Sequence, residues 1–132
     1  RRIVVDGRTV FNVRDAEVAL IAVLLDSADE SLRTAAIEVL APLASALAQR
    51  AIARVALDAN ETESLRISAL EGLAESAKRF GNLLDAPQVT VLSELAMNEP
   101  NLHLRTAAGY ALGALNLSAN KANQAVLKFH RG

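Results

Sequence analysis

A chain of 132 residues, of which 52% are hydrophobic and only 3% aromatic, is long enough for one domain with a core of aliphatic side chains. Its 14 basic and 15 acidic residues nearly cancel, which excludes a strong overall attraction to nucleic acid or to anionic lipid. There is no cysteine for disulfides or thiolate chemistry, and charged residues interrupt every apolar run before the ~20 residues that a membrane-spanning helix needs, so we expect a soluble protein.

The first residues, 1–11, form two β-branched runs around Asp6-Gly7, a dipeptide typical of tight hairpin turns. An isolated hairpin is only marginally stable. We therefore expect this segment either to cap the first helices or to be the remnant of a linker or of a preceding domain. The predicted boundary places residues 12–132 in one helical repeat domain.

Helical periodicity fills the rest of the chain. Capping signals precede the apolar stripes at residues 27–30, 60–63, 85–88 and 98–101. Pro42 and Gly81 are typical of helix ends. Together these signals predict seven helices, at about 14–26, 30–43, 47–58, 61–80, 86–98, 102–115 and 119–130.

One short motif recurs in three of these helices. Leu32-Arg33-Thr34-Ala35-Ala36 returns almost unchanged as Leu104-Arg105-Thr106-Ala107-Ala108 and, loosened, as Leu65-Arg66-Ile67-Ser68-Ala69. The three arginines are separated by 33 and then by 39 residues, which are spacings of helical repeats. The longer second interval predicts a longer loop at about 80–85.

Two columns of this repeat are invariant. Counted from each arginine, the third following residue is always alanine and the seventh is always leucine: Ala36, Ala69 and Ala108, and Leu40, Leu73 and Leu112. Small alanines let helices approach closely and the leucines fill the space between them, so we expect both columns in the core. The tenth position departs once, as Ser76 between Leu43 and Leu115.

The Leu-Arg pair, the small residue three positions later and the leucine seven positions later resemble the HEAT repeat family of α-solenoids. The resemblance implies an all-α, right-handed α-solenoid of about three HEAT-like helix pairs, with the arginine-bearing helices on the concave side and a protein partner bound there. It also implies that Asp26 pairs with Arg33 and Asp58 with Arg66. The third copy departs from this pattern, because Asn98 precedes Arg105.

Candidate site residues follow from the opposite face of the arginine-bearing helices. We expect the arginines themselves to be structural. If the alanine and leucine columns face the core, the fifth position after each arginine lies on the opposite, exposed side of its helix. We expect residues at the first and ninth positions to contribute to the same side. The predicted partner-binding residues are Thr34, Glu38, Ile67, Glu71, Glu75, Thr106 and Tyr110. They form a weakly acidic strip in which Ile67 and Tyr110 are exposed apolar anchors, and we expect a partner segment with some basic character.

The sequence argues against other classes of function. His103 and His130 lie far apart in the repeat frame with no evident nucleophile, and no metal-ligand spacing or phosphate loop is present, so we expect no catalysis, no cofactor and no metal. Gly109 and Gly113 favour close helix packing instead. A HEAT-like glycosylase or lyase remains an alternative.

Nucleic acid is not an expected partner, because the strip is acidic and the chain lacks tryptophan. A second alternative is an architectural segment of a larger protein. In that case a homo-oligomer would form through the solenoid ends, for example by stacking of the helix at about 119–130 on another copy.

Overall fold

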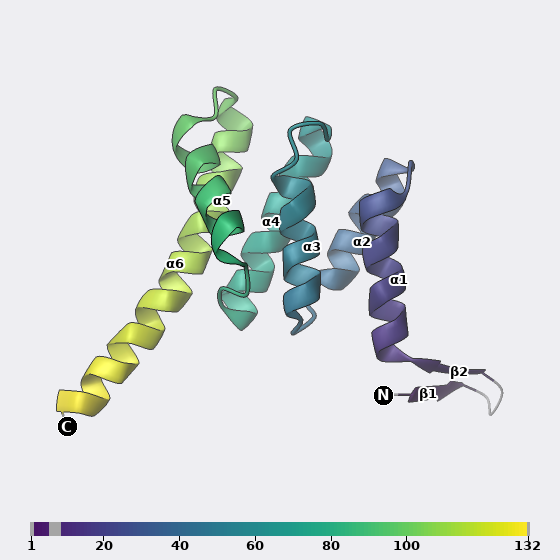
Figure 1. Ribbon diagram of the computed structural model, residues 1–132, viewed down its shortest axis with the longest axis horizontal. Helices are drawn as coiled ribbons and strands as arrows, with labels where there is room; N and C mark the ends of the chain where they lie inside the picture. The colour runs from purple at the N-terminus through teal and green to yellow at the C-terminus, as the bar shows by residue number, and fades with distance from the viewer. Residues whose placement is uncertain (1, 6–8, 132) are drawn as a thin grey trace.

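The computed structural model describes residues 2–5 and 9–131, with side chains described for residues 14–116. Helices dominate this described part (Figure 1): α1 (Val13–Asp26), α2 (Glu30–Leu40), α3 (Ala46–Ala56), α4 (Glu63–Phe80), α5 (Ala86–Asn98) and α6 (Leu102–Arg131). Two short strands, β1 (Arg2–Val5) and β2 (Thr9–Asn12), pair in antiparallel orientation. The Asp6-Gly7 turn that we predicted between them lies outside the described residues.

Side-chain caps explain where the helices begin. The carboxylate of Asp29 accepts hydrogen bonds from the backbone N–H groups of the first turn of α2, and Thr62 and Asp85 do the same for α4 and α5. The start of α3 carried no clear signal in our sequence analysis. There the hydroxyl of Ser45 accepts a hydrogen bond from Ala48 N–H at 3.1 Å.

The expectation of seven helices is wrong, because residues 102–131 form one continuous helix. The separate helix that we predicted at about 119–130, carrying Ala122, Val126 and Phe129, is the second half of this helix. No glycine or proline occurs between Leu115 and Arg131, and asparagine and serine alone only weakly oppose helix formation. The chain therefore continues as α6 without a break.

The helices pack in consecutive pairs: α1 with α2, α3 with α4, and α5 with α6. Alternate helices also contact each other, so that the odd helices form one layer and the even helices α2, α4 and α6 form another, with the pairs side by side in chain order (Figure 1). No helix in the described part combines the length and apolar character needed to cross a bilayer.

The core lies between these layers and contains the two predicted columns. The three alanines three residues after the arginines are all buried. Leu40 and Leu73 are fully buried, and Leu112 is half-buried against the same core. Gly109 and Gly113 do not have the close-packing role that we expected, because a Cβ atom added at either position would meet no described atom within 4 Å.

A buried polar cluster explains why the tenth position changes to serine in the second copy. Gln49 on α3 is fully buried, and its Nε2 donates to Ser76 Oγ at 2.9 Å and to the carbonyl of Gly81 at 3.0 Å. Its Oε1 accepts from Leu83 N–H at 2.7 Å. Ser76 is thus the partner of a buried amide that holds the longer loop after α4 against α3.

Candidate functional site

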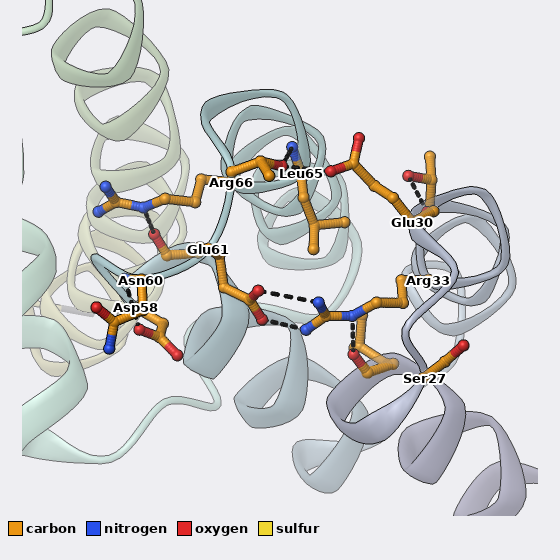
Figure 2. A network of polar contacts seen from close by, with 12 residues as sticks. Ser27, Glu30, Arg33, Asp58, Asn60, Glu61, Leu65 and Arg66 are labelled. Atoms are coloured by element: carbon orange, nitrogen blue, oxygen red, sulfur yellow. Dashed lines mark hydrogen bonds and ion pairs between the residues drawn. The ribbon is translucent and has the colours of Figure 1, made fainter.

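Arg33 ties the first helix pair to the second. Its Nε donates to the carbonyl of Leu24 near the end of α1 at 2.7 Å, and both terminal nitrogens donate to the carboxylate of Glu61 in the loop before α4 (Figure 2). The hydrogen bond with Glu61 raises the pKa of Arg33, and burial acts in the opposite direction. The predicted pairing with Asp26 is therefore wrong, because the carboxylate partner belongs to the next copy of the repeat.

The other two arginines also donate to backbone carbonyls near the end of the preceding helix. Arg66 Nε donates to Ala56 O at 3.0 Å, and Arg105 Nη1 donates to Glu99 O at 3.1 Å. Within the described residues Arg66 forms no ion pair with Asp58, contrary to our expectation. The three arginines share one structural role, which is to satisfy carbonyls that a helix end leaves unpaired.

A second contact recurs between neighbouring copies. The hydroxyl of Thr62 donates to the carboxylate of Glu30, and Asn101 Nδ2 donates to Glu63 Oε1 at 2.6 Å. Both donors lie four residues before an arginine, and both acceptors lie three residues before the preceding one. These links were not predicted from the sequence, although the shared register of donors and acceptors could have indicated them.

We call the seven predicted partner-binding residues together the even-helix surface, since they all lie on α2, α4 and α6. Glu38, Glu71, Glu75, Thr106 and Tyr110 are exposed, and Thr34 is half-buried. The prediction of an exposed Ile67 is wrong, because that side chain is half-buried and packs against the core.

A depression of about 160 Å³ between α2 and α4 brings four of the predicted residues together: Thr34, Glu38, Glu71 and Glu75. Ser68 and Gly72, which we did not predict, also line it. Glu75 lies 3.4 Å from Arg79 on its own helix, whereas Glu38 and Glu71 have no cationic partner among the described residues. Two unneutralised carboxylates therefore face this depression.

The third copy contributes differently. Tyr110 is hydrogen-bonded through its hydroxyl to Lys78 Nζ, which also lies 4.3 Å from the centre of the aromatic ring. This cation–π contact was not predicted from the sequence. Lys78 lies in the last turn of α4. Neither Tyr110 nor Thr106 lines the acidic depression. The even-helix surface thus has an acidic part over α2 and α4 and a tyrosine–lysine part over α4 and α6.

A larger depression of about 350 Å³ lies between α3 and α5. Its walls are mainly apolar, from Leu57, Pro87 and Val91, with Arg54, Asp58 and Gln88 completing the lining. Arg54 and Asp58 carry opposite charges, so this depression has no net charge that would select a charged partner. It is a weaker candidate than the acidic depression.

His103, the focus of the enzymatic alternative, is exposed at the start of α6, where its backbone N–H donates to Asn101 Oδ1 at 2.9 Å. Across the described side chains, no group of three or more histidine, aspartate or glutamate residues is arranged to hold a metal ion.

Comparison of the chain with models of protein families and with curated proteins found no match.

Proposed function

We propose that this chain is a non-catalytic protein-binding module, built as a HEAT-like α-solenoid, whose concave face is the even-helix surface. The arginine hydrogen bonds and the links at the helix starts recur from copy to copy, which supports a stack of equivalent helix pairs. Such stacks present extended surfaces that bind segments of other proteins.

The acidic depression is the observation that carries the proposal. Glu38 and Glu71 face it without a cationic partner, so a lysine or arginine side chain of a partner would supply the missing charge. Its volume of about 160 Å³ is smaller than the roughly 300–1,000 Å³ of small-molecule sites, which favours a single side chain as occupant. The binding mode is a partner segment laid along α2, α4 and α6 with a basic side chain in the depression.

Affinity capture from a lysate tests this function. The wild type is compared with Glu38→Lys/Glu71→Lys, and with Asp15→Lys/Glu94→Lys as a control that changes the net charge equally at exposed positions outside the surface. Circular dichroism establishes that all three proteins are folded. We expect a partner that the wild type and the control retain and that the first variant binds at least ~10-fold more weakly, because its lysines would repel a basic side chain. Retention of every partner by Glu38→Lys/Glu71→Lys would contradict the proposal.

A further inference from the structure

The first helix pair has an apolar position that is covered in the other two. Leu32, the leucine of the first Leu-Arg pair, is 53% exposed, whereas the equivalent Leu65 and Leu104 are 1% and 4% exposed. The residue type and register are the same in all three copies. Exposure therefore reflects position in the stack, since no described helix pair precedes the first one.

A second column shows how such positions are covered inside the chain. A Cβ atom added to Gly72 would lie 2.5 Å from Ile37 Cγ2 and 3.8 Å from Ala41 Cβ of the preceding copy. The sixth residue after one arginine therefore rests on the fourth and eighth residues after the previous arginine. In the first copy the sixth residue is Val39, which is 49% exposed.

At the other end of the stack, the fourth and eighth positions after the arginine, on which a following copy would rest, are glycines. The fourth and eighth residues after Arg105 are Gly109 and Gly113, and a Cβ at either would meet no described atom within 4 Å. In the first two copies the same positions hold buried apolar residues: Ile37 and Leu70, and Ala41 and Ala74. Leu102, which precedes Gly109 on the same face of α6, is 60% exposed.

We propose that a second copy of this chain docks head to tail, with Leu32 and Val39 of one molecule against Gly109 and Gly113 of the next. Between the first and second copies, the large side chain of Ile37 packs against Gly72 of the following copy. In the proposed contact the sizes are reversed, because the following molecule supplies the larger side chain, Val39, and the preceding one supplies Gly109. The new contact continues the register of the existing stack. It uses surfaces other than the even-helix surface and does not depend on the proposed function.

A head-to-tail contact joins two different patches, so each molecule keeps one free patch of each kind. Such a contact produces growing chains or closed rings. The mass-average molecular weight should therefore rise with concentration. Because the patches are apolar, added salt should not weaken the association, unlike binding of a basic partner to the acidic depression.

Sedimentation velocity of the whole chain tests the proposal with two variants. Leu32→Glu/Val39→Glu damages one patch, and Gly109→Arg/Gly113→Arg damages the other. All four positions are exposed or open, so both variants should fold, as circular dichroism would check. Each variant alone should associate at least ~10-fold more weakly than the wild type, because each would bury unpaired charges. Leu47→Glu changes an equally exposed leucine on α3 and should associate like the wild type.

Mixing the two variants gives the sharpest result. Each retains the patch that the other lacks, so the mixture should form a 1:1 dimer that neither variant forms alone and that grows no further. A wild type that remains monomeric at its highest soluble concentration would overturn the proposal. So would association that survives Gly109→Arg/Gly113→Arg, or a mixture that forms no dimer.

Discussion

At Gly72 the backbone of α4 comes close to α2, which belongs to the preceding helix pair. The space that a side chain would need is occupied by the buried Ile37 of α2. Gly109 lies in α6, which is also an arginine-bearing helix, but a Cβ atom added there would meet no described atom within 4 Å. The two glycines therefore separate the effect of packing from that of intrinsic helix propensity.

Gly72→Ala should destabilise the fold. Overpacking a filled core costs about 1–3 kcal/mol, against which the better helix propensity of alanine returns up to about 1 kcal/mol. Gly109→Ala should instead stabilise the protein by up to about 1 kcal/mol. Urea denaturation of both variants, at concentrations too low for self-association, measures the two changes.

A double-mutant cycle provides the control. In an Ile37→Ala background the added methyl group has room, so Gly72→Ala should no longer be costly. Equal destabilisation of both backgrounds would show that the approach of α2 to α4 is not as close as described.

At the scale of elements, the buried Gln49 fixes the loop between α4 and α5. It is bonded to one residue of α4 and to two backbone groups of the loop. These bonds hold the additional residues in the second interval of the repeat against α3.

Gln49→Leu should release this loop. The substitution leaves Ser76, the carbonyl of Gly81 and the N–H of Leu83 without their partner, at a cost of about 1–3 kcal/mol for each group that stays buried. Hydrogen exchange at the Leu83 amide should become faster, while the amides in the middle of α4 should change little. Unchanged protection at Leu83 would show that other contacts hold the loop.

The sequence predicted those elements that depend on nearby residues. The caps at Thr62 and Asp85 satisfy N–H groups within three residues. The start predicted at 86 agrees with the structure, and the one predicted at about 61 lies two residues before the observed start at 63. The partner of Arg33 was missed, because Glu61 lies 28 residues away and reaches it only through the course of a loop. Ile67 was misplaced, since a helix facing two neighbours buries more than one narrow stripe.

At the scale of the whole molecule, the repeat places chemically similar residues side by side. Glu38 and Glu71 lie 33 residues apart in the chain, yet both line one depression because they occupy the same position after successive arginines. Counting positions from the repeated arginines could therefore predict that these glutamates lie side by side. It could not predict the contact of Lys78 with Tyr110, which involves different positions in two copies.

The central claim is that a basic partner segment binds at the acidic depression. The most direct test is a titration of the isotope-labelled protein with a short peptide rich in lysine and arginine, followed by amide chemical shifts, with a glutamine-substituted peptide as the neutral control. We predict saturable shifts concentrated at Thr34, Glu38, Glu71 and Glu75 and no such shifts with the control peptide. Shifts spread evenly over exposed acidic residues such as Glu94, or no shifts at α2 and α4, would contradict the claim.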